Sequence, residues 1–144
     1  MKTRTSLTAI WLVSFAISVT LILSYLRTEH NGMRILFTSD LGPTLRPLCV
    51  LYGSYLAGIL GFWFFKPFKL PADRGHIRFY LAVSCTLLLN APIIWFLLQW
   101  HLAGEGRSES VQTDVESAIS WAKWASFLVA PINLYYFGMK SARA

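Results

Sequence analysis

The feature that most constrains this chain is a set of four long windows that are almost free of charged residues. They run over residues 7–26, 47–65, 79–100 and 119–137, and only the last holds a charge, Lys123, near its start. A hydrocarbon core of about 30 Å needs about 20 helical residues, and a helix satisfies its own backbone hydrogen bonds in lipid. We therefore predict an all-α membrane protein whose single domain is a bundle of four transmembrane helices.

The composition supports this prediction and excludes several other classes of protein. Of the 144 residues, 55% are hydrophobic and 14% are charged, whereas a typical soluble domain is about a quarter charged. A disordered chain, a secreted disulfide scaffold and a nucleic-acid-binding domain are all excluded by this balance. The longest stretches between windows, residues 27–46 and 101–118, are too short for a soluble domain. We expect neither a soluble domain nor a nucleic-acid partner.

The distribution of basic residues predicts how the bundle is oriented. Eight of the 13 Lys and Arg residues lie in the N-terminal segment, the loop after residue 65 and the C-terminal tail. The opposite side holds four: Arg27, Arg34, Arg46 and Arg107. Because cytoplasmic loops carry an excess of Lys and Arg, we predict that both termini face inward. The short loops and the basic inner side suit the cytoplasmic (inner) membrane of a bacterium.

The loop between the second and third windows is short, basic and stiffened by two prolines. Its basic residues are Lys66, Lys69, Arg74 and Arg78. Such residues attract anionic lipid headgroups at about 1 kcal/mol each, so we expect membrane lipids to contact them. We prefer this interpretation, in which they determine topology and contact lipid, to binding of nucleic acid or of a phosphorylated substrate.

Two local patterns predict where helices begin. Residues 38–47 are rich in turn formers, and Pro47 suits the first position of a helix. Thr113 and Glu116 form a capping-box pattern before the fourth window. Alternatively this last helix starts earlier, because Val111, Val115 and Ile119 would share one face.

Small residues recur at four-residue spacing in the first two windows. The second window has Gly53, Ala57 and Gly61, with Ser54 and Gly58 offset by one, and the first has Ala16, Thr20 and Ser24. In lipid, small faces let helix backbones approach closely, so this pattern predicts tight helix packing. The partner is left open between the first helix, a second copy of the chain and another subunit.

Two intramembrane motifs combine asparagine with proline, and they are the best candidate for an internal site. They contain Asn90 with Pro92 in the third window and Pro131 with Asn133 in the fourth. Each proline frees the carbonyl one turn earlier, at Leu88 and Phe127. The asparagines either satisfy these carbonyls, bond across the helix pair, or line a polar cavity for a substrate or lipid.

Other candidate chemistry is sparse. His30 and His101 are expected at the outer rim, where they could ligate haem iron, bind copper or contact a quinone. Neither has the spacing of a haem or metal motif, so we expect no metal and no cofactor. We find no familiar catalytic motif, and no Asp or Glu lies within a window. These absences indicate that the chain is not an enzyme or a self-contained ion-coupled transporter.

The leading functional hypothesis is therefore a non-catalytic membrane subunit or scaffold. Its small-residue helix faces would join it to copies of itself or to a larger membrane complex. The first alternative is a small oligomeric transporter or channel that uses the Asn/Pro motifs. The second is an electron-transfer subunit that holds a cofactor at the two histidines.

Overall fold

The computed structural model describes residues 2–30, 33–65, 76–103 and 110–137. Four long helices make up most of this part of the chain: α1 Lys2–Tyr25, α2 Thr38–Phe65, α3 His76–Ala103 and α4 Val111–Phe137. Two two-residue strands, β1 Glu29–His30 and β2 Met33–Arg34, pair antiparallel between α1 and α2. The predicted four-helix architecture is confirmed, with this small hairpin as an addition.

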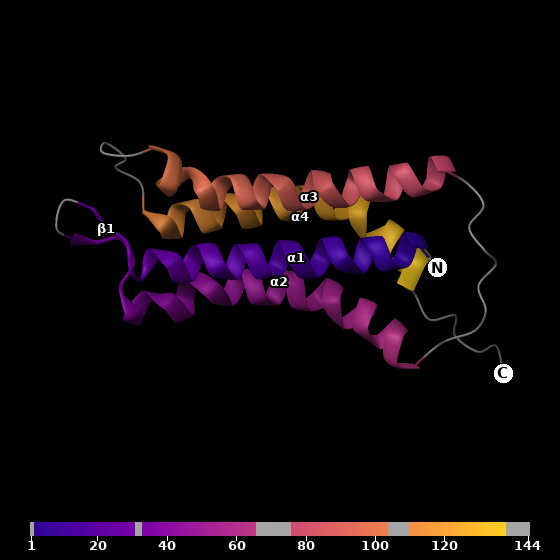
Figure 1. Ribbon diagram of the computed structural model, residues 1–144, viewed down its shortest axis with the longest axis horizontal. Helices are drawn as coiled ribbons and strands as arrows, with labels where there is room; N and C mark the ends of the chain where they lie inside the picture. The colour runs from indigo at the N-terminus through magenta and orange to yellow at the C-terminus, as the bar shows by residue number, and fades with distance from the viewer. Residues whose placement is uncertain (1, 31–32, 66–75, 104–109, 138–144) are drawn as a thin grey trace.

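The helices lie side by side along one long axis (Figure 1). α3 and α2 each pack against both α1 and α4, so that α1 and α4 occupy opposite corners of the bundle. The hairpin lies at one end, and the start of α1 and the end of α4 lie together at the other. Arg4 Nε donates to the carbonyl of Tyr136 at 3.0 Å and so links these two ends.

Three helices are long and apolar enough to cross a membrane, within the residues that the structure describes. These spans are Arg4–Tyr25, Thr38–Phe64 and Ile77–Gln99. α4 has similar length but is less apolar, because it carries Lys123, Asn133 and two acidic residues near its start. Transmembrane character is therefore supported by composition for three of the four predicted spans.

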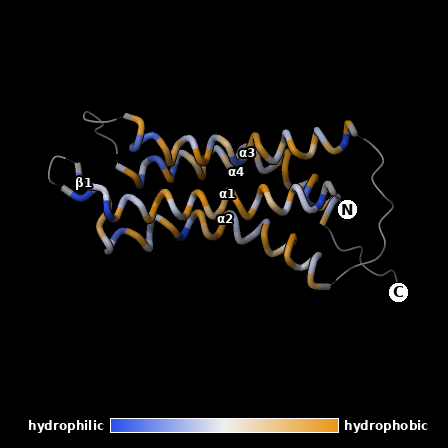
Figure 2. Tube along the Cα trace, viewed as in Figure 1, coloured by the Kyte–Doolittle hydropathy of each residue, from blue (hydrophilic) through white to orange (hydrophobic). Residues whose placement is uncertain are grey.

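The outer surface of the bundle is apolar. Hydrophobic residues predominate along all four helices, and hydrophilic ones gather mainly near the helix ends (Figure 2). Val50, Phe64 and Ile77 are 67%, 79% and 83% exposed, respectively. Soluble monomers rarely expose large contiguous apolar patches, so this surface indicates a membrane protein.

The core combines aromatic rings with buried polar side chains, several of which are hydrogen-bonded. Trp11 of α1 is fully buried, stacks on Tyr55 at 4.4 Å between ring centroids and meets the Tyr52 ring edge-on at 5.9 Å. The Tyr52 hydroxyl lies 3.2 Å from Ser18 Oγ, which also donates to the Ser14 carbonyl. In lipid, such interhelical contacts and packing replace the hydrophobic effect as the force that joins helices.

α2 begins at Thr38, so the prediction of a turn-rich segment ending near Pro47 is wrong. Pro43 and Pro47 lie within the helix on its exposed side, whereas Thr44 and Leu48 are fully buried one turn apart. Thr44 Oγ1 also donates to the carbonyl of Asp40 at 2.7 Å. Packing of the inward face therefore outweighs the low helix propensity of the two prolines.

α4 begins at Val111, and the alternative of an early start is confirmed. Val111 and Val115 are buried on one face, as their spacing predicts. Ser110 is the N-cap, because its Oγ accepts the backbone N–H of Thr113 at 3.3 Å. The capping box expected at Thr113 is therefore wrong, since Thr113 already lies inside the helix.

Candidate functional site

The Asn90–Pro92 motif of α3 lies against α4, and its freed carbonyl has a partner that the sequence motif did not reveal. Trp121 of α4 donates its indole N–H to the Leu88 carbonyl at 3.1 Å. Asn90 is 1% exposed and donates instead to the Thr86 carbonyl at 2.8 Å. Of the alternatives left open for Asn90, satisfaction of the Leu88 carbonyl is therefore wrong, and Trp121 takes that role. Its sequence signal is the indole of Trp121 in an apolar segment, because such an N–H usually binds an acceptor when it is buried.

The Pro131–Asn133 motif of α4 lies between two surface grooves. Pro131 faces the groove shared with α3, and Asn133 lines the groove shared with α2. Asn133 is 9% exposed, and neither its amide nitrogen nor its amide oxygen has a hydrogen-bond partner among the described residues. Asn90 lines neither of these grooves.

The small residues of α2 face away from the bundle. Gly53, Ala57 and Gly58 are exposed, and Gly61 is half-buried. A Cβ atom built at Gly53 or at Gly58 would meet no atom within 4 Å. These two glycines therefore make no close contact with α1 of the same protomer. We call Gly53, Ala57 and Gly58 the small-residue face.

The small residues of α1 are not packed against α2 either. Ala16 and Thr20 are exposed, whereas Ser24 is half-buried and donates to the Leu21 carbonyl at 2.6 Å. The interface between α1 and α2 is filled instead by aromatic residues such as Trp11 and Tyr52. The small residues of α1 and α2 therefore do not bring the backbones of these two helices close together.

The groove between α2 and α4, which we call the α2–α4 groove, adjoins the small-residue face. Its volume is about 520 Å³. All of its described lining residues are uncharged: Ser54, Tyr55, Gly58, Ile59, Ala130, Asn133, Leu134 and Phe137. At its side, the Tyr55 hydroxyl donates to Ser126 Oγ at 2.8 Å and so ties α2 to α4.

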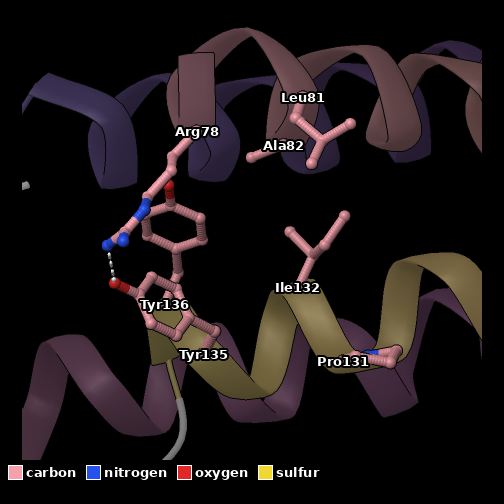
Figure 3. A pocket seen from close by; sticks show the side chains of 7 residues that line it. All are labelled: Arg78, Leu81, Ala82, Pro131, Ile132, Tyr135 and Tyr136. Atoms are coloured by element: carbon pink, nitrogen blue, oxygen red, sulfur yellow. Dashed lines mark hydrogen bonds between the residues drawn. The ribbon is translucent and has the colours of Figure 1, made fainter. Parts of the chain in front are cut away.

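The second groove, the α3–α4 groove, lies between the start of α3 and the end of α4. Its volume is about 340 Å³. In Figure 3, Leu81 and Ala82 point from α3 toward Ile132 of α4, and Arg78 reaches across beside the two tyrosines. Arg78 donates from a guanidinium nitrogen to the Tyr135 hydroxyl at 3.3 Å.

The other basic residues of the predicted lipid contact, Lys66, Lys69 and Arg74, lie outside the described residues. Arg78 is exposed in the first turn of α3. Sequence reasoning assigned no role to Arg4 beyond its charge, yet its guanidinium also lies 4.7 Å from the centre of the Phe62 ring. This contact links the start of α1 to the end of α2.

The histidines were the residues considered for a metal or cofactor. His101 Nε2 lies 3.0 Å from Ser24 Oγ, and its ring stacks on Tyr25 at 4.7 Å. The side chain of His30 is outside the described part of the structure. No group of three or more potential metal ligands occurs among the residues that are described. His101 is thus engaged at the hairpin end in contacts that join α1 to α3.

Comparison with known proteins yields no match to a protein family, to a curated protein or to a solved structure. The geometry of the two grooves and of the small-residue face is therefore the basis for a functional proposal.

Proposed function

We propose that the chain is a non-catalytic integral membrane subunit that assembles laterally with a second copy of itself. In this proposal it lies in a bacterial inner membrane with both termini inward, as the distribution of basic residues favours. α4 is then the fourth span. Its partners are membrane lipids and other copies of the chain, and the proposal requires neither metal nor cofactor.

One observation carries the proposal: the small-residue face points outward beside the buried Asn133 amide, which has no partner among the described residues. The surroundings of Gly53 and Gly58 are open, so the backbone of another helix can approach α2 closely there. Gly58 also lines the α2–α4 groove, which contains Asn133. A helix that packs on Gly58 therefore brings its side chains to this groove.

Asn133 gives the assembly a second source of stability. An unpaired amide in an apolar medium costs several kcal/mol in transfer scales, and in lipid no water compensates for it. Both amide atoms of Asn133 lack a partner among the described residues. Rotation of the side chain toward a seated helix would let the amide bond across the interface.

A second copy is the occupant because the face can pair with itself. A two-fold axis presents the same patch from both protomers, and most soluble homo-oligomers use this closed symmetry. The described lining of the α2–α4 groove has no charged residue that would repel its own copy. A symmetric pair would also cover the exposed apolar side chain of Leu134, which is 71% exposed.

The experiment compares Ala57→Leu and Gly58→Leu with wild type by native mass spectrometry of the protein purified in mild detergent. We expect the wild-type chain to form a dimer or a larger oligomer, and each variant to weaken assembly about tenfold or more, because a leucine holds the backbones apart. A Cβ at Gly58 meets no described atom within 4 Å beyond the backbone of its own helix, and leucine has the higher helix propensity, so the protomer should stay folded.

Ala91→Leu on α3 is the matched control, because Ala91 is also exposed but lies outside the small-residue face and both grooves. It should keep the wild-type mass. The proposal fails if Ala57→Leu and Gly58→Leu keep the wild-type oligomer. It also fails if the wild-type chain is monomeric at every protein concentration measured.

A further inference from the structure

The α3–α4 groove has the positively charged side chain of Arg78 at one end and an apolar lining along the rest. Arg78 lies in the first turn of α3, at the end of the bundle where α1 starts and α4 ends. Beside its side chain, the groove is bounded by Leu81 and Ala82 from α3 and by Ile132 from α4 (Figure 3). Leu81 is 60% exposed, so the groove opens to the outside of the bundle rather than into its core.

The course of α4 creates the space for this groove. The C-terminal part of α4 bends away from α3 toward the start of α1 (Figure 1). Pro131 belongs to the C-terminal part of this helix. A proline inside a helix removes one backbone hydrogen bond and is a common cause of such bends. The bond from Arg4 to the Tyr136 carbonyl holds the bent end in place. The shape of the groove is therefore set by the bend of α4 and by the contact that fixes the end of this helix.

No acidic side chain balances the charge of Arg78 among the described residues that line the groove. Arg78 is the one charged residue of this described lining: Arg78, Leu81, Ala82, Pro131, Ile132, Tyr135 and Tyr136. The Tyr135 hydroxyl accepts one guanidinium N–H, and its own proton can point outward. A guanidinium has five N–H donors in a planar fork, which matches the geometry of a phosphate oxygen pair.

We propose that the α3–α4 groove binds one anionic phospholipid. Arg78 and the Tyr135 hydroxyl hold the phosphate of the headgroup, and one acyl chain lies between α3 and α4 against Leu81 and Ile132. Inorganic phosphate shares the headgroup chemistry but would leave the apolar part of the groove unused. The site rests on the proposed membrane placement but is independent of self-association through the small-residue face.

The test measures lipid binding to the full chain in detergent by native mass spectrometry. The probes are phosphatidylglycerol, diacylglycerol with the same acyl chains, and inorganic phosphate in large excess as a competitor. We expect phosphatidylglycerol to bind about fivefold or more tightly than diacylglycerol, which corresponds to about 1 kcal/mol for one basic residue at the headgroups. Arg78→Gln should remove this preference.

Two kinds of control separate the parts of the site. Arg46→Gln removes an exposed arginine from the first third of α2, outside the described lining of the groove, and should leave the preference intact. Leu81→Trp fills the groove while Arg78 remains, and it should weaken phosphatidylglycerol binding. Because Leu81 is largely exposed, this variant should fold. Ile132→Trp fills the same groove from α4 and serves if Leu81→Trp does not purify with wild-type helicity.

The outcomes distinguish the possible sources of binding. The proposal is overturned if Arg78→Gln and Arg46→Gln have equal effects, since binding would then reflect net charge alone. It is also overturned if inorganic phosphate displaces the lipid or if the tryptophan variants bind normally, because the site would then be a simple anion site. The oligomer mass is read in the same spectra, so a failure of self-association is recognised separately.

Discussion

Pro92 and Trp121 form a pair in which one residue supplies the hydrogen-bond donor that the other removes. Pro92 has no backbone N–H to give to the Leu88 carbonyl, and the Trp121 indole reaches that carbonyl from α4 at 3.1 Å. A carbonyl without a partner is costly in lipid, so the pair couples a helix irregularity to the interface between α3 and α4. The coupling can be measured with two substitutions.

We expect Trp121→Phe to lower the free energy of unfolding by about 0.5 to 1.5 kcal/mol beyond its packing loss, the range of interhelical hydrogen bonds in lipid. In a Pro92→Ala background this part of the cost should disappear, because the alanine N–H can reach the Leu88 carbonyl. Equilibrium unfolding of the four proteins in mixed micelles completes the double-mutant cycle. Equal costs of Trp121→Phe in both backgrounds would contradict the assignment.

The sequence showed which carbonyl loses its hydrogen-bond donor, but not which side chain replaces that donor. Pro92 alone specifies that the Leu88 carbonyl loses its helical partner. Which side chain takes its place depends on how α3 and α4 are registered, and that is a property of tertiary packing. The neighbouring Asn90 was the obvious candidate in sequence, yet its position in α3 directs its amide to the Thr86 carbonyl.

The start of α4 offers a test of one whole element. Ser110 Oγ accepts the Thr113 N–H and lies 3.1 Å from the Thr113 hydroxyl. We expect Ser110→Ala to cost about 1 kcal/mol of unfolding free energy, the usual value of an N-cap, and Thr113→Ala to cost less than half as much. The same unfolding assay checks this. If Thr113→Ala lost more unfolding free energy than Ser110→Ala, Thr113 rather than Ser110 would be the N-cap.

Four apolar windows were enough to predict four helices, because window length and the need for internal hydrogen bonds leave few alternatives in lipid. Helix ends were less predictable. At the start of α2, burial of Thr44 and Leu48 outweighs the turn propensity of the surrounding residues. The spacing of Gly53, Ala57 and Gly58 predicted a packing face, but only the fold reveals that this face points outward.

At the scale of the whole molecule, the two ends of the described chain are held together. Arg4 of α1 contacts the Tyr136 carbonyl and the Phe62 ring, and Phe62 in turn meets the Phe137 ring at 5.7 Å. These contacts join α1, α2 and α4 at one end of the bundle. The grooves along α4 could not be predicted from the sequence, because they depend on how the bent end of this helix sits against both neighbours.

These contacts require the start of α1 and the end of α4 to lie on the same side of the membrane. Because α4 is less apolar than the other three helices, whether it crosses the membrane needs a direct test. If α4 crosses with the rest, both termini lie on one side, and the excess of Lys and Arg favours the inside. We therefore expect a C-terminal fusion to green fluorescent protein to fluoresce and the same fusion to alkaline phosphatase to be inactive. An active phosphatase fusion would mean either three crossings or the opposite orientation.

Cysteine labelling separates these two cases. In a chain with Cys49 and Cys85 changed to serine, Arg34→Cys in the hairpin should react with a membrane-impermeant maleimide in intact cells, whereas Arg78→Cys should react only after permeabilisation. Both sites are exposed, so their reactivity reports the side of the membrane rather than burial. The reverse labelling pattern would mean that the bundle has the opposite orientation in the membrane. The expected pattern with an active phosphatase fusion would leave α4 outside the bilayer, where the bond from Arg4 to the Tyr136 carbonyl could not form.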